Sequence, residues 1–319
     1  MSQHLKALVH TLRYEAQNTL SLEFRPAAGG TFPVFTAGSH INLHLPNGLE
    51  RSYSLCNSCD EQDRYVVAVL RDRASRGGSQ FVHDQLRVGT ILTINTPLNN
   101  FPLVEDAAHS VLIAGGIGVT PLLCMAKRLM GIGRPFEVWL FASSRRNAAF
   151  LDVLHALGVP LLLHFDDEKG APPDLQSLLE TKVGEPSTHF YACGPTAMLD
   201  AFVAATTRLQ IENVHIERFA AQTVAASEEA KRTYTVELAR SGRLITIGPD
   251  KSLLDTLVAV GADINYSCCE GVCGSCRTIV LAGKPDHRDS ILTPKERASN
   301  QAMFPCVSGS KSNLLRLDL

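Results

Sequence analysis

The sequence lacks a charge excess of either sign and any long apolar run. Its 30 basic and 32 acidic residues leave a formal net charge of −2, so no global field would attract nucleic acid or an anionic membrane surface. No stretch approaches the ~20 apolar residues that a membrane-spanning helix needs. His4, Lys6, His10, Arg13 and Glu15 interrupt any signal-like segment at the N-terminus. We therefore expect neither a nucleic-acid nor a membrane partner.

The sequence also lacks the cysteine pattern of a small secreted protein. Its nine cysteines are scattered and odd in number, which argues against a disulfide framework and favours the reducing cytoplasm. Cys56 and Cys59 form one C-x2-C pair, but no second pair lies near them to complete a zinc site. At 319 residues the chain is too long for one ordinary core, since a domain takes roughly 100 to 150 residues. The composition predicts a soluble cytoplasmic enzyme of two or three domains.

A cysteine motif near the C-terminus carries the strongest signal. Cys268, Cys273 and Cys276 stand as C-x4-C-x2-C, and Cys306 follows after a gap of 29 residues. This is the plant-type spacing of a [2Fe–2S] cluster. The glycines between the first ligands let the backbone curl around an inorganic core with its N–H groups toward the sulfurs. Buried or zinc-binding thiols are the alternative, but zinc sites usually pair two C-x2-C knuckles. We therefore predict that these cysteines bind iron and that the protein transfers single electrons.

Cys269 leaves one ambiguity within this motif. Because it adjoins Cys268, it could replace Cys268 as a ligand and shorten the first spacing from x4 to x3. We favour Cys268 as the ligand and expect Cys269 to be a bystander.

The chain divides into segments that differ in residue pattern. Residues 1–105 show short alternating segments between Gly, Pro and Asn turns, which is typical of a small antiparallel β-barrel. Residues 106–222 alternate apolar strands with helices, as in a doubly wound parallel α/β domain. Residues 223–232 are rich in Ala, Glu and Ser and are expected to be a linker. Residues 233–319 contain the cluster motif, and their order of strands and one helix suits a β-grasp ferredoxin.

The expected strands and helices follow from these residue patterns. In the first segment we expect strands at 5–12, 19–24, 40–45, 64–71 and 91–96. In the second we expect strands at 111–114, 136–141, 161–165 and 189–192, and helices at 121–130, 148–157, 175–179 and 196–209. Two acidic clusters, 166–168 and 286–289, are expected to be solvated surface turns.

A glycine-rich turn in the second segment has features of a nucleotide site. Gly115, Gly116 and Gly118 lie between a buried strand and a helix, and we expect Thr120 as the N-cap and Pro121 as the first helical residue. The glycines permit a tight turn, and the helix start offers N–H groups to a pyrophosphate. The alternative is a turn that is merely tight. The glycines do not match G-x-G-x-x-G, which argues against an ordinary dinucleotide-binding dehydrogenase.

A second loop, Cys193-Gly194-Pro195, follows the strand 189–192 and precedes a helix. Both loops should lie at the carboxyl edge of the parallel sheet, where ligands bind. Cys193 would then stand beside the ligand, unless it is a buried structural cysteine. After the strand 136–141, Ser144 and Arg145 could hold a 2′-phosphate, whereas an acidic residue would favour a free 2′-hydroxyl.

In the first segment, two short motifs each combine a cation with hydroxyl groups. Arg51-Ser52-Tyr53-Ser54 follows the strand 40–45, and Arg76-Gly77-Gly78-Ser79 follows the strand 64–71. An arginine and a Gly-Gly-Ser nest could together hold one phosphate, while Tyr53 offers an aromatic surface and Ser54 a donor to a ring nitrogen. The alternative is a pair of solvated arginines beside a glycine hairpin turn. The spacing alone does not identify the ring.

Taken in order, R-S-Y-S, R-G-G-S, G-G-I-G-V-T-P, Y-A-C-G-P and C-x4-C-x2-C…C closely resemble the phthalate dioxygenase reductase family, which includes vanillate demethylase reductase components. The resemblance covers the whole chain. It implies a flavin barrel, a nicotinamide domain like that of ferredoxin–NADP reductase and a fused plant-type ferredoxin, with FMN as the flavin. The residues that it implies at the flavin are Arg51 and Ser79 on the phosphate, Tyr53 and Ser54 on the isoalloxazine, the segment Ala68-Val69-Leu70 alongside it, and Phe219 near it.

The resemblance also implies an electron route and a partner. We expect the nicotinamide of NADH, held by the two loops, to pass a hydride to the flavin, and the cluster to pass single electrons to a Rieske-type oxygenase component. The cofactors carry this chemistry, so we expect no catalytic acid or base. A diiron monooxygenase or a cytochrome P450 is the alternative acceptor, and a redox-sensing module is the alternative class. One chain would carry every redox centre, so we expect a monomer.

Overall fold

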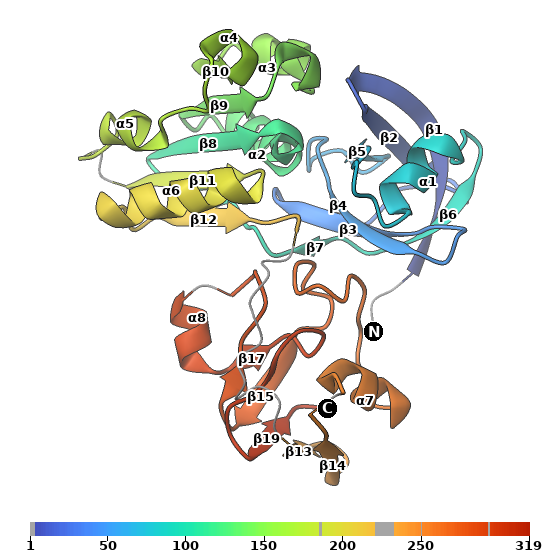
Figure 1. Cartoon of the computed structure of the whole chain (residues 1–319). Coiled ribbons are helices and arrows are strands. Elements are labelled where there is room, and N and C mark those ends of the chain that lie inside the picture. The colour runs from blue at the N-terminus through green and yellow to red at the C-terminus, as the bar shows by residue number, and fades with distance from the viewer. Residues whose placement is uncertain (1–3, 185–186, 221–232, 250, 293) are drawn as a thin grey trace. The chain divides into compact units, whose positions relative to one another are not determined.

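The structure, a computed structural model, describes residues 4–184, 187–220, 233–249, 251–292 and 294–319. The chain divides into two compact units, Ser2–Phe219 and Ala220–Leu319 (Figure 1). The first unit contains an antiparallel barrel and a parallel α/β sheet, and the second contains a small mixed sheet. The predicted three-part fold is therefore confirmed. The predicted linker 223–232 lies outside the described residues.

The barrel strands pair antiparallel in the order β4-β3-β6-β1-β2-β5, and β7 pairs with β3. Alternation along the strands turns one face inward, and Val9, Phe24, Ile41, Val67 and Ile94 from five strands are all fully buried. The elements are β1 (His4–Ala16), β2 (Thr19–Pro26), β3 (Ser39–His44), β4 (Glu50–Ser54), β5 (Tyr65–Leu70), α1 (Gly78–Asp84), β6 (Ile91–Asn95) and β7 (Leu98–Asn99).

Three barrel elements were missing from the prediction: the two-residue strand β7, the strand β4 and the helix α1. The R-S-Y-S motif does not merely follow a strand; it is the strand β4, which pairs with β3. Four of its five residues are half-buried, so it shows no alternation of apolar and polar residues. The R-G-G-S motif leads into α1, a short helix whose apolar Val82 packs into the barrel core. β4 and α1 depend on tertiary packing more than on local pattern.

The α/β part has a fully parallel sheet in the order β10-β9-β8-β11-β12. In β8, Leu112 and Ala114 pack with α2, whereas Val111 and Ile113 pack with α5 and α6 on the opposite face. Burial on both faces explains the near-continuous apolar run of this strand. The elements are β8 (His109–Gly115), α2 (Val119–Gly131), β9 (Phe136–Ala142), α3 (Leu151–Ala156), β10 (Leu161–Phe165), α4 (Asp166–Lys169), α5 (Leu175–Glu180), β11 (Thr188–Cys193), α6 (Thr196–Arg208) and β12 (Val214–Glu217).

Helix α2 joins the barrel to the parallel sheet. Its residues Leu122, Leu123, Cys124, Met125 and Ala126 are all buried, and they share one apolar core with barrel strands and with β8 and β9. Figure 1 shows α2 between these two parts. A helix that is apolar around most of its first half is buried on several sides. The shared core explains why the barrel and the α/β part form one compact unit.

The second unit has the sheet order β14-β13-β19-β15-β17, in which β13 pairs antiparallel with β14 and parallel with β19. Its core includes Val236, Leu253, Leu257 and Leu315. The elements are β13 (Tyr234–Leu238), β14 (Arg243–Ile247), α7 (Leu253–Ala259), β15 (Thr278–Ala282), β16 (Pro285–Asp286), α8 (Pro294–Ser299), β17 (Ala302–Met303), β18 (Gly309–Ser310) and β19 (Leu314–Leu317).

Of the two clusters expected to be surface turns, only 286–289 differs from the prediction, since Asp167 and Glu168 are exposed. Residues 166–168 form the first turn of α4. Asp289 is buried, and its Oδ2 accepts hydrogen bonds from the backbone N–H groups of Ile291 and Leu292 at 3.1 and 2.8 Å. A buried carboxylate is stable only with such donors. In the described part of the chain, no helix combines the length and the apolar character that crossing a membrane would require.

Candidate functional site

Residues from both arginine motifs line one cavity of the first unit, with a volume of about 250 Å³. Its walls come from β4, β5, the loop before α1 and the start of α2, and Phe219 adds a half-exposed ring from beyond β12. The structure therefore brings together most of the residues predicted to bind the flavin. The lining residues are Arg51, Ser52, Tyr53, Ser54, Ala68, Leu70, Asp72, Ser75, Arg76, Ser79, Ile117, Thr120 and Phe219.

Arg51 connects the two motifs. Its guanidinium donates to the carbonyl oxygens of Glu50 at 2.8 Å and Arg76 at 3.2 Å. Gly77 has a left-handed φ of 90°, which a side chain would oppose. A Cβ on Gly78 would lie 2.6 Å from Nε of Arg51. The two glycines therefore have different tasks: Gly77 turns the chain, and Gly78 leaves room for the arginine side chain.

The strand segment Ala68-Val69-Leu70 presents only alternate side chains to this cavity. Ala68 and Leu70 line it. The side chain of Val69 is fully buried in the barrel core, and its carbonyl oxygen accepts from Nε2 of His83 at 2.9 Å. If this strand runs alongside a flavin as expected, Val69 can contribute only its backbone, because side chains alternate across a strand.

A larger cavity of about 710 Å³ lies at the carboxyl edge of the parallel sheet. Gly115, Gly116 and Ile117 from the first predicted loop and Pro195 from the second line it, as do Arg71, Asp72 and Arg73 from the barrel. Leu70, Asp72 and Ile117 line both this cavity and the smaller one. The two cavities therefore share a wall.

The glycines of the two loops pack against each other. A Cβ on Gly118 would lie 2.1 Å from the carbonyl oxygen of Cys193, and one on Gly194 would lie 2.8 Å from Cα of Gly115. A Cβ on Gly115 would lie 2.6 Å from Cδ of Pro195. Real Cβ atoms do not approach other atoms so closely. Close loop packing therefore requires these glycines, whereas Gly116 has open space around it and a left-handed φ of 53°.

The start of helix α2 differs from the prediction. Gly116–Gly118 form a 3₁₀ turn that continues directly into α2, so Gly118 is the N-cap and Val119 is the first helical residue. Thr120 is not the cap; its hydroxyl donates to the carbonyl oxygen of Ile117 at 3.1 Å. Pro121 is buried in the first turn. A 3₁₀ turn at a helix start moves the cap toward the N-terminus.

Ser144 and Arg145 lie at the end of β9 but do not line the larger cavity. The Arg145 guanidinium pairs with Glu168 at 3.2 Å and stacks over the Phe165 ring at 4.4 Å from its centroid. Asp166, which directly follows β10, does line the cavity. An acidic side chain therefore lines this cavity, but it follows the neighbouring strand β10 and not β9.

A carboxyl group that sequence reasoning did not assign lies between the two predicted sites. Ser54 Oγ donates to Glu217 Oε2 at 3.2 Å, and Cys193 Sγ lies 4.0 Å from the same oxygen. Desolvation raises the pKa of Glu217 to about 8, although the hydrogen bond from Ser54 opposes the shift. Cys193 itself is fully buried, and burial raises its thiol pKa well above the usual value. Glu217 is therefore mostly protonated at pH 7, and Cys193 is not a thiolate.

In the second unit, the four predicted cluster cysteines form two pairs. The thiol of Cys268 interacts with that of Cys273, and the thiol of Cys276 interacts with that of Cys306. Within the described residues, no set of three or more His, Cys, Asp or Glu side chains surrounds a single metal position. Two thiols for each of two iron atoms is the ligand count of a [2Fe–2S] cluster. The pairing fits a two-iron cluster and does not fit one zinc ion.

Backbone donors around these sulfurs also fit a cluster. The N–H of Glu270 donates to Cys268 Sγ at 3.3 Å, and the N–H of Gly271 points to Cys306 Sγ. Such hydrogen bonds stabilise a reduced cluster and tune its potential. Cys269 has a left-handed φ of 56° and is exposed, and its thiol points to the carbonyl oxygen of Ser267 at 3.5 Å. This orientation favours Cys268 over Cys269 as the ligand.

Comparison with known proteins agrees with this geometry. Residues 236–310 match the family described as 2Fe-2S iron-sulfur cluster binding domain. The chain is 46% identical to phenoxybenzoate dioxygenase subunit beta of Ectopseudomonas oleovorans over 312 residues, which cover 98% of this chain and 96% of the relative.

Two solved structures resemble the whole chain. The crystal structure of an intact type IV self-sufficient cytochrome P450 monooxygenase has a TM-score of 0.91 and 35% identity, and the match covers 99% of this chain but only 41% of that longer one. Phthalate dioxygenase reductase has a TM-score of 0.71 and 34% identity, and the match covers 99% of this chain and 98% of that one. The chain therefore belongs to the phthalate dioxygenase reductase-like family of NAD(P)H-dependent flavin and [2Fe–2S] oxidoreductases.

Proposed function

We propose that this protein is the reductase component of a Rieske-type oxygenase, which takes a hydride from NADH and delivers single electrons to its partner. The wall shared by the two cavities carries this proposal, because Leu70, Asp72 and Ile117 line both of them. A flavin in the smaller cavity and a nicotinamide in the larger one would meet at this wall. When bound, the flavin and the cluster convert a two-electron donor into a source of single electrons.

The proposal assigns a separate role to each domain of the chain. Residues 1–105 form the flavin barrel, 106–222 the NAD domain, 223–232 a linker and 233–319 the ferredoxin. Cys268, Cys273, Cys276 and Cys306 hold the cluster. The nicotinamide nucleotide lies against the loops that contain Gly115, Gly116, Gly118, Thr120, Pro121, Cys193, Gly194 and Pro195.

For the flavin we propose FMN. Arg51 and Ser79 both line the smaller cavity, and Arg51 is held across Gly78 by the carbonyl oxygens of Glu50 and Arg76. A fixed guanidinium beside a hydroxyl suits one terminal phosphate. Mass spectrometry of the flavin released by heat tests this assignment. Release of FAD instead of FMN would contradict it.

For the partner we propose a Rieske-type oxygenase. A plant-type cluster near about −400 mV can reduce a Rieske centre at about −150 mV or above. The experiment mixes the protein anaerobically with NADH and with purified candidate acceptors: a Rieske oxygenase, a diiron monooxygenase and a cytochrome P450. Rapid reduction of the Rieske centre alone supports the proposal, and preference for either other acceptor contradicts it. Absence of flavin bleaching by NADH would contradict the electron route itself.

Asp166 leads us to predict a preference for NADH over NADPH. A carboxylate in the nucleotide cavity would accept a hydrogen bond from a free 2′-hydroxyl and repel a 2′-phosphate, and Arg145 is already paired with Glu168. We expect kcat/KM for NADH to exceed kcat/KM for NADPH. Asp166→Ala should reduce the ratio of these two values by about tenfold or more, because a hydrogen bond to a charged group contributes about 1.5–3 kcal/mol.

The matched control for this prediction is Asp167→Ala. Asp167 is exposed and does not line the cavity, so its removal should leave the ratio unchanged. Equal ratios in the wild type and the Asp166→Ala variant would show that Asp166 does not select the nucleotide.

Glu217 leads to a second prediction, which concerns how the stability of the folded protein depends on pH. Its carboxyl holds a proton between Ser54 and Cys193, and its pKa is about 8 in the folded protein against an ordinary value of 4.5. As pH rises from 5 to 8, the unfolded chain releases this proton before the folded protein does, so the folded state loses stability relative to low pH. The expected loss of unfolding free energy over this pH range is on the order of 2 to 5 kcal/mol.

The variant Glu217→Gln removes this titration. We expect its melting temperature to change less than that of the wild type between pH 5 and pH 8, and to exceed the wild-type value at pH 8. Thermal unfolding of the full-length protein, followed across this pH range, checks the prediction. Glu168→Gln is the control, because Glu168 forms an exposed ion pair that contributes little. Parallel pH profiles for the wild type and Glu217→Gln would contradict it.

A further inference from the structure

Two cysteines that the electron route does not use lie together in the first unit. Cys59 belongs to the loop between β4 and β5 of the barrel, and Cys124 belongs to helix α2. Although they are distant in sequence, their thiols lie close enough to interact with each other. The backbone N–H of Gly38, directly before β3, also points to the Cys124 sulfur. The contact therefore joins the barrel to the helix that it shares with the parallel sheet.

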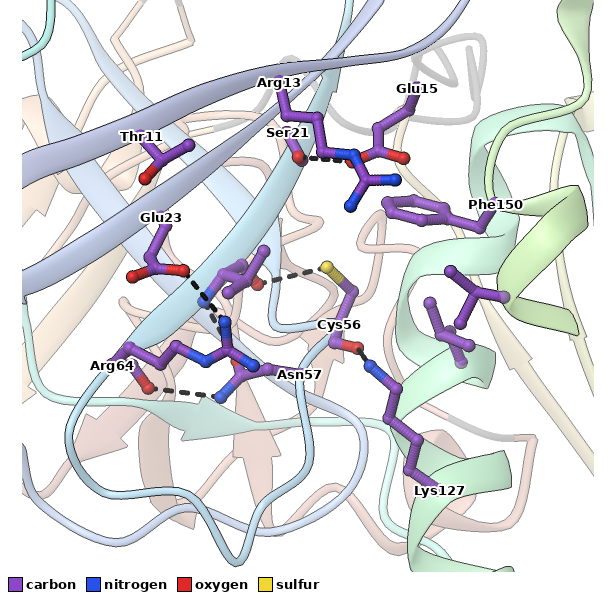
Figure 2. A pocket seen from close by; sticks show the side chains of 13 residues that line it. Thr11, Arg13, Glu15, Ser21, Glu23, Cys56, Asn57, Arg64, Lys127 and Phe150 are labelled. Atoms are coloured by element: carbon purple, nitrogen blue, oxygen red, sulfur yellow. Dashed lines mark hydrogen bonds and ion pairs between the residues drawn. The ribbon is translucent and has the colours of Figure 1, made fainter. Parts of the chain in front are cut away.

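Contacts on either side of Cys59 fix its loop on α2. Lys127 Nζ donates to the carbonyl oxygen of Cys56 at 3.0 Å, as Figure 2 shows. Arg128 Nη1 donates to Asp60 Oδ1 at 3.3 Å. Cys124 precedes Lys127 and Arg128 by one helical turn and so shares their face of α2. Cys59, between the two anchored loop positions, is thereby held over Cys124.

The two thiols differ in access and in proton affinity. Cys59 is partly exposed, whereas Cys124 is fully buried. The interaction with the Cys124 thiol, together with the nearby charge of Arg128, lowers the pKa of Cys59 to about 7 against the opposing effects of burial and Asp60. The same contact raises the pKa of Cys124. An accessible thiolate beside a buried thiol is the usual arrangement of a peroxide-reactive cysteine and its resolving partner.

We propose that Cys59 and Cys124 form a modification site for hydrogen peroxide, which converts them into an intramolecular disulfide between the β4–β5 loop and helix α2. The Cys59 thiolate attacks one peroxide oxygen, the O–O bond breaks, and a proton completes one water molecule, which leaves a sulfenic acid on Cys59. Cys124 then attacks that sulfur, its proton and the sulfenic hydroxyl leave as a second water, and the S–S bond forms. The two thiols lose two electrons in total, and the peroxide gains them.

The disulfide would link the barrel to α2, which share one apolar core. These two parts must separate when the first unit unfolds. A covalent link of this kind restricts the unfolded chain. We therefore expect the oxidised protein to melt at a higher temperature than the reduced protein, and dithiothreitol to reverse the shift. The proposal does not depend on the identity of the electron acceptor, so failure of the Rieske assignment would leave it intact.

The test treats the full-length protein, with its cofactors bound, with a small excess of hydrogen peroxide at neutral pH, and then denatures it and alkylates the remaining thiols. Non-reducing tryptic digestion should then yield a linked pair of peptides, 52–64 and 88–127, which contain Cys59 and Cys124 and end at Arg64 and Lys127. Because peptide 52–64 also contains Cys56, fragment spectra of the linked pair must place the bond on Cys59.

Variants provide the controls. Cys59→Ser should abolish the linked peptide and the melting shift, and Cys124→Ala should abolish the link and leave Cys59 over-oxidised to a sulfinic acid. Cys269→Ser removes a different exposed thiol and should leave the linked peptide unchanged. The proposal is wrong if Cys124 remains alkylatable after peroxide treatment of the wild type, or if the bond joins Cys56 in place of Cys59. The wild-type result decides the matter even if the Cys124→Ala variant does not fold.

Discussion

Replacement of Cys268 by serine will remove the cluster from the full-length protein, whereas replacement of Cys269 by serine will leave it in place. The reason is the pairing of thiols: Cys268 interacts with Cys273, while Cys269 is exposed and its thiol points to the carbonyl oxygen of Ser267. Loss of one thiolate leaves an iron with an incomplete ligand set. Visible absorption and the electron paramagnetic resonance signal of the reduced protein measure the loss directly.

The same pair of variants separates the cluster from the upstream sites. The cluster cysteines belong to the unit Ala220–Leu319, and the two cavities belong to the unit Ser2–Phe219. Cys268→Ser should therefore still bind flavin and oxidise NADH with ferricyanide, but it should reduce a Rieske acceptor at no more than the background rate. If Cys269→Ser loses the cluster and Cys268→Ser keeps it, the ligand spacing is x3 and our register is wrong, although the electron route stands.

The sequence was most informative where function depends on spacing along the chain. A cluster loop must place three thiolates within a few residues of one another, so the motif is visible without a structure. Short apolar runs were also accessible: the strand 161–165, Leu-Leu-Leu-His-Phe, was predicted with its observed bounds. The strand β4 was not, because its half-buried residues include charged and hydroxyl side chains that also suit a turn.

Features that depend on contacts between distant segments could not be predicted. Glu217 acquires its raised pKa only because the folded chain buries it beside Ser54 and Cys193. Cys59 and Cys124 likewise carry no shared sequence signal, because their contact requires a barrel loop to lie on α2. Ser144 and Arg145 have the right residue types after the right strand, but the ion pair with Glu168 directs Arg145 away from the cavity. Residue type and position along the chain do not determine such partners.

The glycines of the nucleotide turn show how the structure changes the meaning of a motif. From sequence, Gly115, Gly116 and Gly118 are read as a phosphate-binding turn. In the structure, Gly118 and Gly115 meet the backbone or side chains of the second loop, and only Gly116 has free space around it. The motif therefore specifies how the two loops fit together as well as what they bind.

Replacement of Gly118 by alanine should destabilise the first unit and impair NADH oxidation together. The φ of Gly118 is −61°, which alanine adopts freely, so backbone strain is not the cause. The added Cβ would lie 2.1 Å from the carbonyl oxygen of Cys193, and a backbone atom cannot rotate away as a side chain can. We expect a loss of about 1 to 3 kcal/mol in unfolding free energy, as for other overpacked sites, with a higher KM for NADH.

Gly131→Ala is the matched control for this change, because both glycines belong to or adjoin the same helix. Gly131 is the last residue of α2, and an added Cβ would meet only Asp60 Oδ2 at 3.8 Å, an ordinary contact. Alanine at a helical position lowers the entropy of the unfolded chain, so this variant should be as stable as the wild type or up to about 1 kcal/mol more stable. Chemical denaturation of both variants, with KM for NADH measured alongside, distinguishes the outcomes. If Gly118→Ala matches Gly131→Ala in both measurements, the contact between the two loops does not hold the nucleotide site together.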